Sequence, residues 1–174
     1  MWRLHVVNHY TPEAADQDRQ LRHFIMPTVL TDIEQLRAHR PIYLGTSDEP
    51  CQIYSLPTGD YEKRQWIPMQ IKLNDDELAV MQAFDAASPG FNDLVGDFYG
   101  NPCVTVRVSH RYTKFFDQCR SRRDRHILKV HSDVNIVVVP TRSICTCNGK
   151  KGKRGVHLHA RVVTDVTLGP GPLY

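Results

Sequence analysis

Long apolar runs are absent from this chain of 174 residues. No segment approaches the roughly 18 consecutive apolar residues of a membrane-spanning helix, and the opening residues lack the apolar region of a secretory signal. The five cysteines are an odd number without the spacing of a secreted disulfide scaffold, which favours reduced thiols. These absences predict an intracellular protein, cytoplasmic or nuclear.

Other signatures are missing as well. No glycine-rich loop leads into Lys-Ser or Lys-Thr, which argues against a P-loop nucleotide site. The sequence shows no internal repeat, no interdomain linker and no recognition helix of the helix-turn-helix type. Because 41% of the residues are hydrophobic, the chain can bury a sizeable core. We expect residues 1–174 to form a single domain.

Positive charge is scarce in the first part of the chain and abundant in the second. Residues 1–99 hold 8 Lys and Arg against 15 Asp and Glu, whereas residues 100–174 hold 14 against 4. Such a lopsided distribution predicts a polyanionic partner for the basic C-terminal part. The alternative is that the acidic N-terminal part neutralises the basic part within one fold.

Alternation, capping residues and turn signals predict the secondary structure. Strands are expected at 4–7, 41–44, 52–56, 66–73, 104–109, 126–131 and 134–139, with Pro68 marking an edge or bulge and Pro140 ending the last strand. Helices are expected from Thr11, over 31–39 with Thr31 as N-cap, from Asn74, and over 112–119. Residues 88–102 are expected to form a loop or broken helix. This pattern predicts an α+β fold, a mostly antiparallel sheet of about eight short strands with three or four short helices.

The stretch from Arg142 to Val166 resembles a β-hairpin with a basic, glycine-rich tip. Folding it about Gly152 brings Cys147 opposite His157 and Cys145 opposite His159, with all four side chains on one face. Thiolates and imidazoles are preferred zinc ligands, so this register predicts a zinc site. The alternative is a pair of buried cysteines and a pair of exposed histidines, since both pairs have one intervening residue where zinc knuckles use two.

The run His157-Leu158-His159 also resembles the His-hydrophobic-His motif of HUH endonucleases, which hold a divalent metal beside a tyrosine nucleophile. The resemblance covers residues 157–163 and implies a metal-assisted nuclease or phosphodiesterase that uses His157, His159 and Tyr112. Tyr112 lies upstream of the motif, whereas those enzymes usually carry the tyrosine downstream. The run is similar to part of a histidine-triad motif too, with Arg161 in place of the third histidine.

Two basic clusters carry the main functional prediction. One follows the aromatic segment 112–116, and the other forms the hairpin tip: Arg120, Arg122, Arg123 and Arg125; Lys150, Lys151, Lys153 and Arg154; with Arg107, Arg111 and Lys114 as flank. Such groups neutralise phosphates, and aromatic rings among them can stack on unpaired bases. We predict a nucleic-acid-binding protein, with RNA or single strands favoured. The alternatives are the histidine-based enzyme and an effector that docks on an acidic protein partner.

Overall fold

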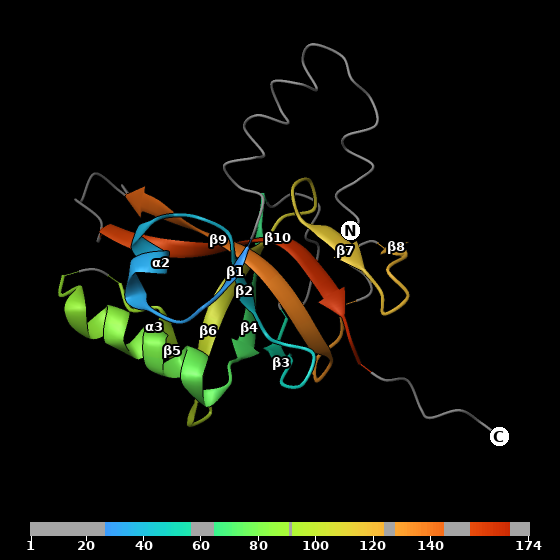
Figure 1. Cartoon of the computed structure of the whole chain (residues 1–174), viewed down its shortest axis with the longest axis horizontal. Coiled ribbons are helices and arrows are strands. Elements are labelled where there is room, and N and C mark those ends of the chain that lie inside the picture. Colours follow the sequence, from blue (N-terminus) through green and yellow to red (C-terminus); the bar gives the residue numbers. More distant parts are fainter. Residues whose placement is uncertain (1–26, 57–64, 91, 124–127, 145–153, 168–174) are drawn as a thin grey trace, which may run out of the picture.

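The computed structural model describes residues 27–56, 65–90, 92–123, 128–144 and 154–167. The elements expected before residue 27 lie outside this part of the chain. The described residues form helices α2 (Ile33–Arg37) and α3 (Asp75–Ala87) and ten strands (Figure 1). The strands are β1 (Thr28–Val29), β2 (Ile42–Leu44), β3 (Cys51–Ser55), β4 (Ile67–Lys72), β5 (Val95–Phe98), β6 (Asn101–Val108), β7 (Lys114–Phe116), β8 (Arg122–Arg123), β9 (Asp133–Ile144) and β10 (Arg154–Asp165). Neither helix has the length and apolarity needed to cross a membrane.

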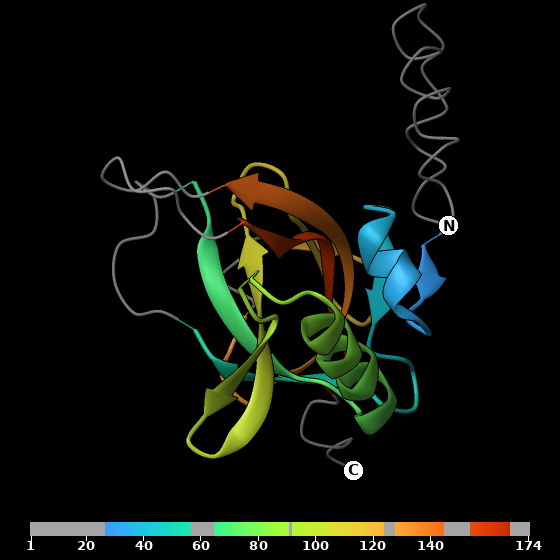
Figure 2. The same cartoon turned by 90° about the vertical axis from the view of Figure 1, so that its left-hand side faces the viewer.

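Five strands close into a barrel. The sheet contains the order β9-β3-β4-β6-β10, and β10 pairs again with β9, so the ring has no free edge. β3, β4 and β6 follow one another in the sheet, and β9 returns to lie beside β3, which is the arrangement of a Greek key. β10 closes the ring, parallel to β6 and antiparallel to β9. A small Greek-key barrel of five strands is the architecture of the OB-fold. Figure 2 shows α3 beside the barrel and the β5–β6 hairpin extending past it.

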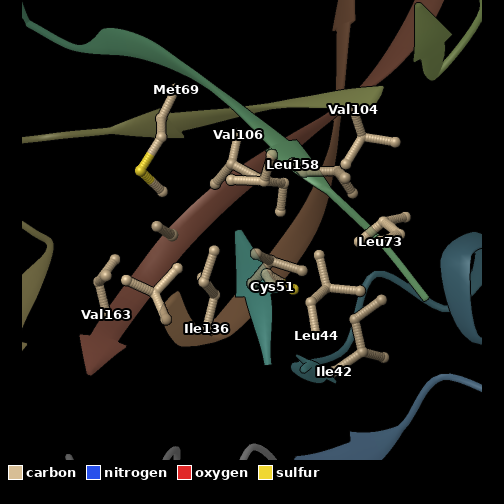
Figure 3. Close-up of a cluster of buried hydrophobic side chains, with 14 of the residues drawn as sticks. Ile42, Leu44, Cys51, Met69, Leu73, Val104, Val106, Ile136, Leu158 and Val163 are labelled. Carbon is tan, nitrogen blue, oxygen red and sulfur yellow. The ribbon is translucent and has the colours of Figure 1, made fainter. Parts of the chain in front are cut away.

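Alternation along the strands fills the interior of this barrel. In β4, and in β6 from Val104 onward, every second residue is buried, which directs Met69, Ile71, Val104 and Val106 to one side of the sheet. Figure 3 shows several of these side chains meeting Leu158 of β10 in the core. Since closure buries one face of each barrel strand, short elements share one continuous core. The predicted antiparallel character is confirmed, but the fold is mostly β and has fewer helices, in the described residues, than expected.

The helix expected over residues 112–119 is wrong. Lys114–Phe116 forms β7, which pairs in parallel with β10 and antiparallel with β8. Because β10 extends beyond the end of β6, the far part of β10 has an open edge with which β7 can pair. Aromatic residues such as those of β7 are also favoured in a strand that packs on both of its faces. Phe115 enters the barrel core, while Phe116 joins a smaller outer cluster with Val137 and Val162.

Residues 88–102 differ from expectation as well, because 95–98 and 101–108 form the β5–β6 hairpin. The strand expected at 126–131 is wrong for residues 128–131, which form a loop and turn.

Neither proline acts quite as expected. Pro140 does not end its strand, and β9 continues to Ile144 opposite β10. β2 pairs with β9 only as far as Val138, so the missing N–H of Pro140 can face the side without a described partner strand. Pro68 lies in β4, which is an internal strand of the sheet. The pairing of β3 with β4 stops at Gln70, so β4 has no partner on the β3 side at Pro68 and resembles an edge strand there.

The helix α3 is anchored by a buried carboxylate. Asn74 caps it, as the sequence predicts, and forms a capping box with Glu77, while Met81 and Phe84 are buried. The Glu77 carboxylate also accepts the N–H of Gly45 at 2.8 Å, which fastens the loop between β2 and β3 to the helix. Gly45 has φ +83°, and a Cβ there would lie 2.7 Å from the Asn135 Oδ1, so only glycine fits.

Candidate nucleic-acid interface

β10 changes face at Arg161. Val156, Leu158 and Ala160 enter the core before this residue, whereas Val163 enters it afterwards. The pairing with β9 shifts between Ala160 and Val162, which makes Arg161 the extra residue of a β-bulge. His157 and His159 alternate with the core residues, so both lie half-exposed on the outer face of the barrel.

The predicted pairing of these histidines with cysteines is wrong. His157 lies opposite Thr141 and His159 opposite Val139, because the two strands meet six residues away from the expected register. Cys145 and Cys147 lie beyond the end of β9, outside the described residues. Within the part of the chain that the structure describes, no group of three or more His, Cys, Asp or Glu could hold a metal ion. The observed register therefore does not support the predicted convergence of two cysteines and two histidines. Bound zinc stays a prediction, which elemental analysis of the purified protein can test.

Arg107 occupies the centre of the outer face. It lies opposite His159 of β10 on one side and opposite Pro68 of β4 on the other. Its guanidinium carbon lies 4.0 Å from the ring centroid of Trp66, the residue before β4, in a cation–π arrangement. We call this surface the Arg107 face and define it by Trp66, which precedes β4, and by the outward, at least partly exposed residues of the three strands: Pro68, Gln70, Lys72, Thr105, Arg107, His157 and His159.

The residues that define the Arg107 face include no aspartate or glutamate, whereas acidic residues of the N-terminal part occupy the first turn of α3. Burial lowers the pKa of His157 and His159, and the nearby Arg107 lowers both further. For His159, the charges of His157 and Arg161 add to this effect. Both imidazoles are therefore more readily neutral than free histidine.

The first predicted basic cluster lies on the turn and strand that follow β7. Arg120, Arg122 and Arg123 are all exposed. Arg122 lies 5.8 Å from the ring centroid of Phe116, and Arg123 donates to the Asp117 carboxylate at 2.9 Å. That ion pair is local to the turn, so it does not clamp the cluster to the acidic N-terminal part. Burial of Phe115 and Phe116 removes them as stacking partners for bases.

The second basic cluster is largely beyond the described residues. Lys150, Lys151 and Lys153 lie outside them, as does Arg125 of the first cluster, and Arg154 is placed by its backbone as the first residue of β10. The predicted β-hairpin itself is confirmed by the antiparallel pairing of β9 and β10.

Tyr112 lies in the turn between β6 and β7 and is 68% exposed. Thr113 fixes this turn, since its hydroxyl donates to the carbonyl of Ala160 at 2.7 Å. The turn therefore packs beside the bulge at Arg161. The structure thus brings His157 and His159 onto one face, as the sequence predicts, and places Tyr112 in a neighbouring turn.

Sequence reasoning missed the aromatic residues of the outer surface. Trp66 was assigned to a strand alone, and Tyr54, Phe98 and Tyr99 received no role. Tyr54 of β3 stacks on Phe98 of β5 with ring centroids 5.2 Å apart, and Tyr99 contacts Phe98 edge-on at 4.8 Å. The alternation of β6 signals that Arg107 points outward, but pairing across three strands is needed to bring it over Trp66.

Comparisons with known proteins give structural likeness without a family. No family model and no curated protein matches the sequence. Among solved structures, the single-stranded DNA-binding protein from bacteriophage Enc34 in complex with ssDNA has a TM-score of 0.45 and 14% identity, over 77% of this chain and 88% of that one. The single-stranded DNA-binding protein gp2.5 encoded by bacteriophage T7 has a TM-score of 0.45 and 13% identity, over 76% and 89%.

Proposed function

We propose that this protein binds single-stranded nucleic acid across the Arg107 face. The observation that carries the proposal is the guanidinium of Arg107 over the ring of Trp66, on a strand where Arg107 lies directly opposite His159. The indole and the planar guanidinium together form a surface on which an unpaired base can stack. The positive charge of the guanidinium can also attract the phosphate of the same nucleotide. Arg107 and His159 lie on paired strands of the closed barrel, and Trp66 directly precedes β4.

Aromatic stacking favours an unpaired over a duplex ligand. An aromatic ring can stack on a base only when the base is unpaired, because a duplex presents its bases as edges in the grooves. Stacking of this kind also tolerates any base, since each has a π-face. We infer binding with little dependence on sequence, to DNA or RNA of single-stranded form.

The basic clusters predicted from the sequence supply further phosphate contacts in this proposal. Arg120 and Arg122 are exposed beyond β7, and the hairpin tip adds Lys150, Lys151, Lys153 and Arg154. Exposed cations release counterions when they neutralise phosphates, so affinity should fall steeply as salt rises.

Tryptophan fluorescence tests the proposal directly. The chain contains two tryptophans, so a Trp2→Phe variant leaves Trp66 as the one reporter. Titration with a thymidine oligonucleotide of about 16 nucleotides, within the site sizes of OB-folds, should quench its emission. A duplex of the same length should quench it much less. An RNA oligonucleotide of equal length shows whether the 2′-hydroxyl matters.

The contrary outcome is equally clear. If neither single-stranded probe changes the fluorescence or its own anisotropy at low salt, the proposal is wrong. The two other predicted functions are tested with the same protein. Cleavage of labelled DNA or RNA that is lost in His159→Ala would favour the histidine-based enzyme. Binding to an acidic protein without affinity for any nucleic acid would favour the effector.

A further inference from the structure

The tip of the β5–β6 hairpin is built on an unfavourable residue. Its two loop residues, Tyr99 and Gly100, have φ values of +49° and +86°. Positive φ at both central positions is the pattern of a type I′ turn, for which Asn-Gly is the preferred pair. A tyrosine in the left-handed region is uncommon because its Cβ crowds the backbone. The turn therefore carries local strain at Tyr99.

The side chain of Tyr99 does little for the fold in return. The ring is 91% exposed, so it buries almost no apolar surface. The turn is fixed by neighbours instead: the Asp97 carboxylate accepts the N–H of Gly100 at 3.1 Å, and the Asn101 amide donates to the carbonyl of Phe98 at 3.3 Å. Strain kept at an exposed residue points to a role in binding.

The ring is also held in place from below. Tyr99 meets Phe98 edge-on at 4.8 Å, with an angle of 83° between the rings, and Phe98 stacks on Tyr54 at 5.2 Å and 14°. Three aromatic residues from β3, β5 and the turn thus form a stepped platform with its upper ring in solvent. We call these residues, Tyr54, Phe98 and Tyr99, the hairpin platform.

The hairpin platform lies on the same side of the sheet as the Arg107 face. Phe98 pairs with Asn101 of β6, and Asn101, Cys103, Thr105 and Arg107 follow at every second position. Arg107 follows Asn101 by six residue steps along the strand, which is about 20 Å. Asp97 alternates to the other side, so no carboxylate interrupts the described surface of β6 between the two positions.

We propose that the hairpin platform is a second stacking site for an unpaired base of the nucleic-acid strand that crosses the Arg107 face. The inference rests on the proposed function and extends it. Trp66 and Arg107 take one base, and Tyr99 takes another several nucleotides along the same strand. A short oligonucleotide fills one site, whereas a longer one reaches both.

The test is a substitution that separates fold from binding. Tyr99→Asn gives the turn its preferred Asn-Gly pair, so the melting temperature should stay equal or rise. Tyr99→Phe keeps the ring and serves as the matched control. Each protein is titrated with labelled thymidine oligonucleotides of about 4 and about 16 nucleotides, the two ends of the range of OB-fold site sizes.

The expected pattern is specific. Tyr99→Asn should weaken binding of the longer oligonucleotide roughly 10-fold and leave the shorter one unchanged, whereas Tyr99→Phe should match the wild type for both. Equal affinity of Tyr99→Asn for the longer probe overturns the inference, as does an equal loss for both probes. If the wild type binds neither probe, the proposed function itself has failed. If Tyr99→Asn changes only self-association of the protein, the platform serves a second copy of this chain and the inference is wrong.

Discussion

Two charged residues of this barrel are used in opposite ways. Glu77 of α3 is buried and accepts the N–H of Gly45, which joins the helix to the loop between β2 and β3. Arg107 of β6 is half-exposed and lies over Trp66 on the outer surface, opposite His159. One charge fastens two parts of the fold together, and the other contributes to a cationic, aromatic surface that faces solvent.

The difference supports the proposal that the Arg107 face binds an external ligand. A buried carboxylate is tolerated only when internal donors satisfy it, and Glu77 has them. Burial nevertheless raises the pKa of Glu77, so the fold tolerates its charge rather than favouring it. The Arg107 face places Arg107 over an indole ring and also carries Lys72, which is the basis for proposing it as the surface that binds an anionic ligand. The comparison therefore predicts variants that lose affinity without stability, and others that lose stability without affinity.

The largest effect is expected from the double variant Trp66→Ala/Arg107→Glu. It removes the indole and reverses the central charge, so affinity for single-stranded oligonucleotides should fall more than about 100-fold, given 1–3 kcal/mol per stacked base. Fluorescence anisotropy measures the affinity, and circular dichroism checks that the barrel is intact. Gln82→Ala on the exposed surface of α3 is the control and should bind normally. Retained affinity in the double variant would place the interface elsewhere.

The complementary effect is expected at Glu77. Glu77→Ala leaves the buried N–H of Gly45 without its acceptor and should lower the free energy of unfolding by about 1–3 kcal/mol. Glu77→Gln keeps one acceptor oxygen and removes the buried charge, so its loss should be much smaller. Urea denaturation measures both.

The pH dependence of the same variants gives a second check. A raised pKa means that wild-type stability should decrease as pH rises above the ordinary value of 4.5, where the unfolded carboxyl ionises first. This decrease should be absent in Glu77→Gln. Both Glu77 variants should bind oligonucleotides normally wherever they remain folded, and a selective loss of affinity would contradict the division of roles between the two residues.

A smaller effect is expected at the hairpin tip. Reversing Lys150, Lys151, Lys153 and Arg154 to glutamate should weaken binding to all sequences alike and flatten the salt dependence, by a slope of roughly 0.7 for each phosphate that is no longer neutralised. A filter-binding titration across salt concentrations measures that slope. Unchanged affinity and slope would remove the tip from the interface.

The smallest effect is expected from protonation of the two histidines. Their pKa values are held below the ordinary 6.5, so both are neutral at pH 7.5. A bound phosphate favours the charged form, so oligonucleotide affinity should rise a few-fold as pH falls below 6.5. Stability has the opposite sign: the fold should lose stability over the same range, because the unfolded histidines take up protons first. His157→Gln/His159→Gln should flatten both curves, and an unchanged pH dependence would exclude the histidines as the cause.

Much of the local structure could be predicted from the residues. The capping box at Asn74, the alternation of β4 and β6 and the hairpin of β9 and β10 follow from short-range patterns. The predicted N-cap of α2 was one residue too early. Asp32 is the N-cap and forms a capping box with Gln35, where Thr31 and Glu34 were expected. β5 was missed because Val-Gly-Asp-Phe has no strand pattern of its own and forms a strand through pairing with β6.

The candidate site was less predictable because it is assembled from three strands. Arg107 was expected to be outward and basic, yet nothing near it in sequence indicates Trp66 or His159 as neighbours. The hairpin register was misjudged for the same reason. Turn glycines suggested a fold about Gly152, but burial of Val156, Leu158 and Ala160 in the barrel determines which residues of β9 and β10 meet.

The sequence by itself determined the local features of this protein: a cationic C-terminal half, β-strands with one apolar side, and a capped helix. These depend on residue type and on spacings of two to four residues, which short-range forces decide. Tertiary structure alone decided that β10 lies parallel to β6, and hence that Arg107, Trp66 and His159 share one surface. Closing a barrel brings distant residues together through backbone pairing and a common core. Neither of these produces a short-range pattern in the sequence from which the contacts could be predicted.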